Sequence, residues 1–356
     1  LPRRREAMSR TGRSGTCGTS GSLAALTVRG TNSTWPGLLA GVMLALAAGP
    51  SLAIQIADPV PPLGELGIDG VYRNGAWTSL RVRQPVQPQG FVRAWVEDVD
   101  GQWVGSPPVP VRGPGDRHSI APLSVRPGRP GGRVRIEFLP DAALPADRPG
   151  STAVETTELQ AGAGEVSSTT PLVLIVGNLP TAAAAVRLVA SDDRRPEIVS
   201  LETNDHRLTG WRELDGYDAA IVCGSQVASL PPDSLAAIDG WVRRGGRLVF
   251  AAGESAPTIS AGSSRAADWL PGAGPRLVPL KRFGAIEAYA RAGGLAARVP
   301  AAGIEVPRFE GKEGIAGVVD AFEGTTAADL PLVIRRAHGL GTITWVGLDV
   351  DAPWCR

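Results

Sequence analysis

The sequence predicts an α/β protein in which a parallel-sheet domain follows a small all-β sandwich. The stretch Tyr217–Gly253 has the pattern strand, loop, helix, strand, which is the βαβ unit of a parallel sheet. Between residues 67 and 139, by contrast, short alternating strands are separated by turn residues without any helical pattern. The two patterns therefore indicate two successive domains of different class.

The composition is that of an ordinary globular chain. With 356 residues, of which 43% are hydrophobic, the chain is long enough for two packed domains. The 36 basic and 35 acidic residues give a formal charge of +1, so no global field favours nucleic acid or an anionic membrane. Cys17, Cys223 and Cys355 form no CxxC motif or His/Cys cluster, and the sequence predicts no metal site and no cofactor.

The first 53 residues have the pattern of an export signal. Residues 1–34 are polar and basic without periodicity, which is typical of a disordered leader. Leu38–Ala48 has the length of a signal-peptide apolar core, and Ser51–Ala53 supplies the small residues of a cleavage site. The alternative is an uncleaved membrane anchor over residues 35–54. Both interpretations predict a periplasmic or anchored protein that faces outside the cytoplasm.

Residues 55–140 are expected to form the β-sandwich domain. Trp77–Arg83 and Val134–Phe138 alternate between apolar and charged residues, and Phe91–Val96 is apolar. Asp100-Gly101 predicts a hairpin turn, because this dipeptide favours tight turns between antiparallel strands. The same turn begins as a calcium loop does, but it lacks the further ligands and the closing glutamate.

Residues 141–170 are interpreted as a linker, because Ala, Gly, Ser, Thr and Pro dominate there. The pattern allows one additional strand around Thr152–Leu159. Residues 171–356 are then the α/β domain. It opens with a buried strand at Leu172–Val176, a helix at Thr181–Ala190 and a second strand at Glu197–Leu201.

The central unit of this domain has the clearest signals. Ala219–Cys223 is a short apolar strand, and Pro232–Arg244 carries apolar residues at helical spacing. Gly245 and Gly246 end the helix, since a residue just past a helix often needs positive φ. Leu248–Phe250 is the second buried strand. The later elements are a short helix, a strand and a terminal hairpin, at Arg265–Leu270, Arg276–Leu280, and Leu332–Arg336 with Thr342–Val350, and residues 281–328 are expected to be irregular.

The motifs YDAAIVCG, WVRRGGRLVFAAG and GLGTITWVGLDVDAPW together resemble the class I glutamine-amidotransferase-like domains of bacterial envelope proteins. The resemblance covers residues 171–356 and implies a flavodoxin-like parallel sheet. Exported members are often linked to β-sandwich domains and membrane segments, and YRNGAWTSLRVR (Tyr72–Arg83) resembles the first strand of such a sandwich. Members commonly continue after the last motif, so the resemblance also implies a C-terminal extension that could reach the membrane.

An active amidotransferase needs a cysteine on a tight strand-to-helix turn, activated by a histidine that a carboxylate orients. Glu254 stands where the resemblance implies that cysteine, and Ala256 stands in place of a second glycine. Ser255 and Cys223 are the remaining candidate nucleophiles. We expect Ser255 to cap a helix or to bond backbone at a turn, and Cys223 to be a buried structural thiol.

The histidine that would act as the base is also missing from the matching positions. His118 belongs to the predicted sandwich, His206 lies in a polar segment, and His338 lies in the turn of the terminal hairpin. We expect each of them to be a solvated surface side chain. Asp349 and Asp351, which alternate at the end of the last strand, are expected to be exposed polar residues.

The sequence therefore favours a non-catalytic binding or scaffolding protein of the cell envelope, whose partner is another envelope protein or a small molecule. Open α/β sheets bind ligands at the carboxyl ends of their strands. The candidate crevice residues at those ends are Asn178, Ser225, Gln226, Glu254 and Ser255.

Two alternatives remain. One is a hydrolase or amidotransferase with a rearranged site, in which Ser255 or Cys223 works with His206 or His338. The other is a carbohydrate-related or oligomerisation domain, which aromatic side chains lining the strand-end crevice would favour.

Overall fold

The computed structural model describes the chain between residues 64 and 352 with internal gaps. The described ranges are 64–84, 90–110, 119–140, 149, 155–160, 164–189, 195–203, 208–290, 303–310, 314–326 and 329–352. Residues 59–356 form one compact unit, and the other unit, residues 1–58, lies outside the described part. The predicted export signal, His118 and His206 therefore also lie outside it. None of the described helices is both long and apolar enough to span a membrane.

Residues 64–160 contribute two antiparallel sheets. Their strands are β1 (Gly64–Leu66), β3 (Thr78–Gln84) and β7 (Ser119–Val125) in one sheet, and β5 (Trp103–Gly105), β4 (Phe91–Glu97), β8 (Arg133–Leu139) and β9 (Glu155–Gln160) in the other, with β6 (Val109–Pro110) beside β4. Leu80 and Leu123 of the first sheet share one buried cluster with Val92 and Ile136 of the second. Along β4 and β8 the residues of this cluster occupy alternate positions, as expected for strands with one face toward a core.

The predicted hairpin turn at Asp100-Gly101 is confirmed. β4 and β5 pair in antiparallel fashion around it, and Gly101 has a φ of +76°. Oδ1 of Asp98 accepts hydrogen bonds from the backbone N–H groups of Asp100 (3.0 Å) and Gln102 (2.7 Å). This carboxylate therefore holds the turn itself, which explains the calcium-like spacing without a cation.

The stretch Tyr72–Arg83 does not form the single strand that the sequence predicts. A turn through Gly75, whose φ is +77°, separates β2 (Tyr72–Arg73) from β3. β2 pairs in parallel with β10 (Glu165–Val166) instead. The segment interpreted as a linker thus contributes β10, together with β9 at the place where one additional strand was expected.

A seven-stranded mixed sheet forms the α/β part and confirms the predicted parallel βαβ unit. In spatial order its strands are β12 (Glu197–Leu201), β11 (Leu172–Val176), β13 (Ala219–Cys223), β14 (Arg247–Ala251), β19 (Gly341–Val346), β18 (Leu330–His338) and β17 (Val318–Glu323). The pairings from β12 to β19 are parallel, and those of β19 with β18 and of β18 with β17 are antiparallel.

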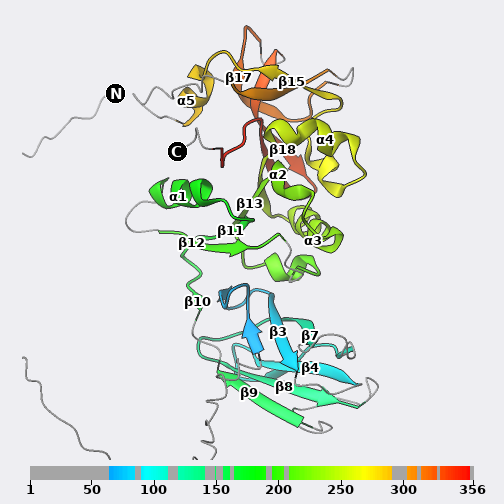
Figure 1. The fold of residues 1–356 in the computed structure, drawn as a ribbon. Helices are drawn as coiled ribbons and strands as arrows, with labels where there is room; N and C mark the ends of the chain where they lie inside the picture. The colour runs from blue at the N-terminus through cyan, green and yellow to red at the C-terminus, as the bar shows by residue number, and fades with distance from the viewer. Residues whose placement is uncertain are drawn as a thin grey trace, which may run out of the picture. The chain divides into compact units, whose positions relative to one another are not determined.

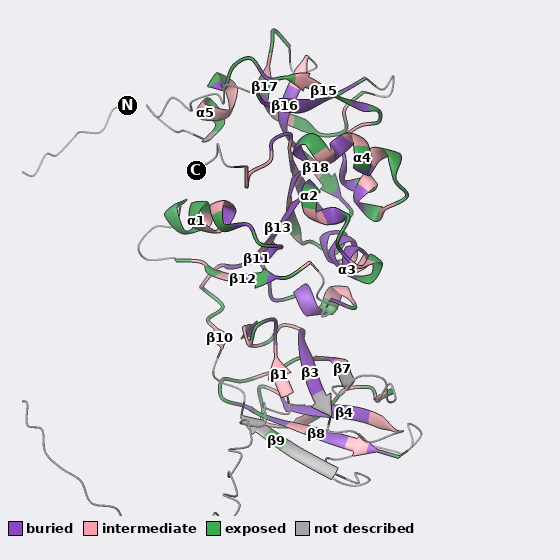
Figure 2. Ribbon diagram, viewed as in Figure 1, coloured by how far each residue is buried: buried purple, intermediate pink, exposed green. Residues whose placement is uncertain are grey.

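Helices cover both faces of this sheet, because its strands are apolar on both sides. Leu174 and Val176 of β11 belong to the cluster under α3 (Pro232–Val242), whereas Val173 and Ile175 belong to the cluster under α1 (Pro180–Val189). Figure 1 shows α1 on one side of the strands and α3 on the other. Figure 2 shows the central strands buried over most of their length. Such continuous apolar strands are typical of parallel sheets.

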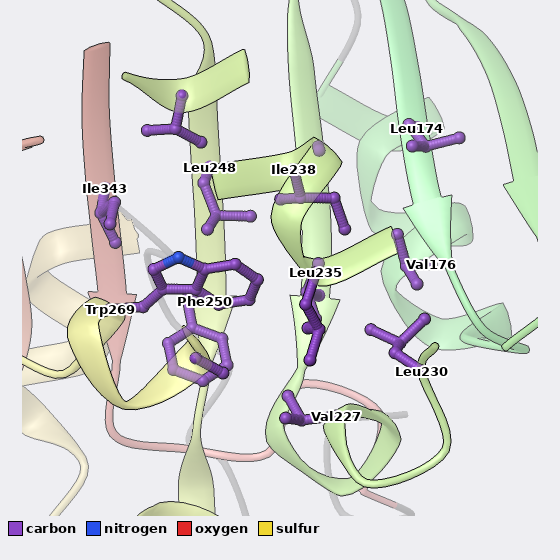
Figure 3. Close-up of a cluster of buried hydrophobic side chains, with 14 of the residues drawn as sticks. Leu174, Val176, Val227, Leu230, Leu235, Ile238, Leu248, Phe250, Trp269 and Ile343 are labelled. Carbon is purple, nitrogen blue, oxygen red and sulfur yellow. The ribbon is translucent and has the colours of Figure 1, made fainter. Parts of the chain in front are cut away.

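Helix α3 packs through the apolar stripe that its sequence predicts. Leu235 and Ile238 point toward Leu248 and Phe250 of β14, as Figure 3 shows. Trp269, from the short 3-10 helix η3 (Arg265–Trp269), meets Phe250 edge-on, with ring centroids 5.3 Å apart. Burial of each such side chain contributes roughly 1.5–3 kcal/mol, so this face carries much of the stability.

The end of α3 also follows the prediction. The regular helix ends at Val242, and Gly245 after it has a φ of +122°. A β-carbon at Gly246 would lie 2.4 Å from the Trp241 ring. Gly245 thus supplies the positive φ, and Gly246 lets the chain turn closely over the tryptophan.

The prediction that residues 281–328 are irregular is wrong. They contain α5 (Gly284–Ala290), β16 (Glu305–Phe309) and the edge strand β17, and β16 pairs with β15 (Pro275–Pro279). Two short helices were also not predicted, α2 (Gly224–Val227) and α4 (Ala256–Ala261). All of these elements are short, and their burial depends on contacts with strands distant in sequence, so local periodicity does not reveal them.

Glu213 links the 3-10 helix η1 (Trp211–Leu214) to the antiparallel part. Its buried carboxylate accepts hydrogen bonds from Oγ of Ser124 (3.0 Å), Oγ1 of Thr209 (3.2 Å) and N of Gly210 (2.7 Å). Burial raises the pKa of Glu213 above its ordinary value of 4.5, and the three hydrogen bonds only partly offset this effect.

This raised pKa predicts a pH dependence of stability. Because folded Glu213 holds its proton more strongly than the unfolded chain, its contribution is fully present below about pH 4.5 and is lost as the pH rises through the folded pKa. The free energy of unfolding of the wild type, minus that of Glu213→Gln, should therefore fall with rising pH over this interval. A difference that stays flat across this interval would contradict the prediction.

Candidate functional sites

The candidate crevice residues gather at the carboxyl edge of the seven-stranded sheet. A β-carbon at Gly177, which follows β11, would lie 2.9 Å from Oε1 of Gln226. A β-carbon at Gly224, which follows β13, would lie 3.0 Å from Cβ of Ser255. The structure therefore brings Gln226 and Ser255 to this edge with the exposed residues Asn178, Ser225 and Glu254 on the same turns.

Asp349 and Asp351 also lie at this edge, in a way that the sequence did not predict. β19 ends at Val346, so the two aspartates lie in the following turn and do not alternate on a strand. Oδ1 of Asp351 accepts a hydrogen bond from N of Thr181 (3.0 Å) in the first turn of α1. The helix dipole favours a carboxylate at a helix N-terminus. Asp351 therefore occupies the N-terminus of α1, a position where an anionic ligand could otherwise bind.

The two candidate nucleophiles differ in accessibility. Cys223 is completely buried at the end of β13, under the face that α1 covers, as expected for a structural thiol. Ser255 is half-buried and occupies the N-cap position of α4, but its hydroxyl makes no capping hydrogen bond. Glu254, on the turn after β14, is exposed.

His338 is not a solvated surface residue, and that expectation is wrong. Its ring is buried, and Nε2 lies 2.6 Å from Oδ1 of Asp239 on α3. Asp239 also accepts hydrogen bonds from Nε of Arg243 (2.7 Å) and from Nε1 of Trp269 (3.3 Å). The histidine is therefore part of a buried structural network around one carboxylate.

The same network carries more positive groups than negative ones. Nη1 of Arg265 lies 3.9 Å from Asp239, and Arg336 donates to the backbone oxygen of Asp268. Although burial disfavours its ionised form, hydrogen bonds from Arg243, His338 and Trp269 lower the pKa of Asp239. Burial lowers the pKa of Arg336. Hydrogen bonding thus explains the shift of Asp239, and desolvation explains the shift of Arg336.

His338 lies at the opposite edge of the sheet from the candidate nucleophiles. It pairs with Gly341, and the next residue, Thr342, pairs with Arg247 at the amino end of β14. Ser255 follows the carboxyl end of β14. Four residue steps along that strand span roughly 13 Å, far beyond hydrogen-bond reach. His338 cannot therefore act as the base for Ser255 or Cys223 in this arrangement.

A second concave feature, which we call the amino-edge cleft, lies at the amino ends of β13 and β14. Its volume is about 350 Å³. The lining residues come from the segments before the two strands and from the end of α3, and they are Trp211, Asp215, Tyr217, Asp218, Trp241, Arg244, Gly245, Gly246 and Arg247. No periodic pattern in the sequence predicts this cleft. The tryptophans and charged residues around Tyr217 are the signal that the sequence offers.

Contacts with the antiparallel part hold the two aspartates of the amino-edge cleft. Nη2 of Arg73 lies 2.9 Å from Oδ2 of Asp218, which also accepts from N of Leu172 (2.8 Å). Oδ2 of Asp215 accepts from N of Trp77 (3.1 Å). Despite the desolvation that raises it, the pKa of Asp218 is lowered by these bonds from Arg73 and Leu172.

A stack of tryptophans and arginines forms one wall of the cleft. The guanidinium carbon of Arg244 lies 4.6 Å from the ring centroid of Trp211. Arg212 approaches the same ring at 5.1 Å and the Trp77 ring at 5.4 Å. Cation–π contacts of this kind fix the orientation of the arginine side chains, so this wall is preorganised.

Within the described residues, no group of three or more His, Cys, Asp or Glu side chains is arranged to hold a metal ion. No protein-family model matches the chain, and no curated protein matches it.

Several solved structures, among them the following three, give weak matches. The first is the exo-beta-1,4-mannosidase Op5Man5 from Opitutaceae bacterium strain TAV5, with 15% identity and a TM-score of 0.29, over 51% of this chain and 32% of that one. The beta-galactosidase from Bacillus circulans sp. alkalophilus has 10% identity and a TM-score of 0.24, over 50% and 28%. A cyclomaltodextrinase has 14% identity and a TM-score of 0.18, over 57% and 44%. Each alignment spans less than half of the other protein, and the low TM-scores carry no statement about fold or activity.

Proposed function

We propose that this chain is an exported, non-catalytic binding or scaffolding protein built on an amidotransferase-like fold. It would act outside the cytoplasm and present the carboxyl edge of its seven-stranded sheet to an envelope protein or a small molecule. The observation that carries the proposal is the separation of its chemical groups. Ser255 and Cys223 belong to one edge of the sheet, whereas His338 is held by Asp239 at the other.

The strand order supports a flavodoxin-like assignment for the α/β part. The five parallel strands are arranged β12-β11-β13-β14-β19, which in chain order is 2-1-3-4-5. In that order the connections change direction between β11 and β13, where Gly177 approaches Gln226. The two antiparallel sheets that share a core likewise support the assignment of a β-sandwich to the preceding region.

Three features support the absence of catalysis. An exposed carboxylate, Glu254, replaces the expected thiol, and the buried Cys223 is inaccessible to substrate. Asp351 caps α1 at the point where the sheet would otherwise attract an anionic group. Ser255 is the accessible hydroxyl among the candidate nucleophiles, and no described histidine lies near enough to activate it.

The proposal predicts that electrophiles will not label the folded protein at these positions. The full exported chain would be treated at neutral pH with a serine-directed fluorophosphonate and, separately, with a thiol-directed maleimide, and its intact mass measured over time. We expect no adduct at Ser255 or Cys223 until the protein is unfolded, when Cys223 should react. Ser255→Ala and Cys223→Ala are the matched controls that locate any adduct. Rapid stoichiometric labelling of the folded wild type, absent from one of these variants, would identify a nucleophile and overturn the non-catalytic assignment.

A further inference from the structure

The amino-edge cleft lies at the edge of the sheet opposite the crevice proposed above, and packed aromatic side chains line it. Trp241 and Tyr217 are buried in its floor, with 4% and 7% of their surfaces exposed. Gly246 packs against the Trp241 ring, and the Trp211 ring is held by Arg244. A cleft of about 350 Å³ with a preformed aromatic wall falls at the lower end of the range for small-molecule sites, roughly 300–1,000 Å³.

The charged side chains of this cleft differ in how many hydrogen bonds and salt bridges they make. Asp218 is paired with Arg73, so the two charges compensate each other. Arg244 uses Nη1 for the backbone oxygen of Gly240 (2.9 Å), and among the described residues its guanidinium donates no other hydrogen bond. Arg247 is exposed and makes neither a hydrogen bond nor a salt bridge within the described part of the chain. The guanidiniums of Arg244 and Arg247 thus line the cleft with N–H groups that donate no hydrogen bond to the described residues.

The opposing acceptor is Asp215. Its Oδ2 atom accepts from N of Trp77, and its side chain is exposed on the cleft wall. The lining carries two arginines, Arg244 and Arg247, and two aspartates, which are Asp215 and Asp218. Arg73 beside Asp218 and Arg212 in the tryptophan–arginine wall add two positive charges, so the net charge around the cleft is +2. This arrangement suits an anionic ligand that also carries hydroxyl donors.

From this arrangement we propose that the amino-edge cleft binds a small sugar acid, a hydroxylated ring with one carboxylate. A carboxylate matches the planar donor fork of arginine at Arg244 and Arg247. A ring hydroxyl donates to Asp215. A neutral sugar would leave the two guanidiniums without a charged acceptor.

The test is calorimetric titration of the full chain with four probes, which are glucuronate, glucose 6-phosphate, glucose and acetate. We expect glucuronate to bind more tightly than each of the others, because it alone supplies both one carboxylate and the hydroxylated ring. Binding should weaken with added salt, since the charged contacts are partly exposed. Equal heats for glucose or acetate, tighter binding of glucose 6-phosphate, or no binding of glucuronate would each overturn the proposal.

Variants locate the binding. Arg247→Gln removes an exposed guanidinium that stabilises no described hydrogen bond, so the variant should fold normally. We expect its affinity for glucuronate to fall about tenfold, the loss of one charge-assisted hydrogen bond. Arg187→Gln, at an exposed arginine on α1, is the matched control and should bind as the wild type does. Equal affinities for the two variants would place any glucuronate binding elsewhere and overturn the assignment of this cleft.

Discussion

Replacing Asp239 with alanine is expected to lower the free energy of unfolding by roughly 3–5 kcal/mol, because it removes one partner from a buried ion network. The substitution leaves the buried ring of His338 and Nε1 of Trp269 without their acceptor. It also removes the salt bridge to Arg243, at 2.7 Å, although that arginine is half exposed and contributes less. Urea-induced unfolding followed by tryptophan fluorescence measures the effect.

Asp233→Ala is the matched control for this prediction. Asp233 lies on the same helix, in its first turn, and is exposed. Its favourable interaction with the helix dipole is worth only about 0.3–1 kcal/mol. If Asp239→Ala destabilised the protein no more than Asp233→Ala does, the network around Asp239 would not be a stabilising element.

Gly341→Ala is expected to cost about 3 kcal/mol or more, the upper range for overpacking a close backbone contact. A β-carbon at Gly341 would lie 2.0 Å from the backbone oxygen of Val242 and 2.3 Å from that of Gly246. N of Leu340 donates to the oxygen of Arg243 (2.9 Å), and N of Thr342 to that of Gly246 (3.1 Å). The added methyl group must therefore push the β18–β19 turn away from the end of α3. Thermal and urea unfolding should both register the loss.

Gly284→Ala provides the comparison, because a β-carbon there would meet no atom within 4 Å and Gly284 begins α5. We expect this substitution to be neutral or slightly stabilising, since alanine is the better helix former. A similar loss of stability for both variants would mean that steric contact does not explain the effect at Gly341.

The sequence was sufficient to predict the centre of the α/β part. Buried parallel strands are apolar on both faces, so Leu172–Val176 and Ala219–Cys223 stand out from their surroundings. α3 combines an apolar stripe with a proline start and a glycine end, and each of these signals acts locally. Signals of this kind depend only on neighbouring residues, so they can be recognised without knowing the rest of the fold.

Elements that depend on distant contacts were not predicted. β16 is five residues long, and it is buried because β15 pairs with it and Leu332 packs on Val306. His338 follows a pattern that suggests a solvated turn, but it is buried and contacts Asp239, which lies 99 residues away in the chain. Such pairings arise from tertiary structure and leave no periodicity in the chain.

Of the two candidate sites, one could be predicted from the sequence and the other could not. The carboxyl-edge residues, including Gln226 and Ser255, could be named because strand ends are visible in the sequence. The amino-edge cleft could not, since its wall joins Trp211 to Arg244, which lie on separate elements. Only the packing of α3 over β13 and β14 brings these residues together.

The position of β19 has a consequence for how the chain folds during synthesis. β19 is the last of the described strands, yet it lies between β14 and β18 in the sheet. Until residues 341–346 have been synthesised, β14 remains an open edge whose unpaired backbone N–H and C=O groups can pair with other chains. This sheet cannot close before then, because the pairing of β14 with β19 bridges a long sequence separation. The nascent chain would depend on chaperones over that interval, and a product truncated before Gly341 would aggregate rather than form a smaller stable domain.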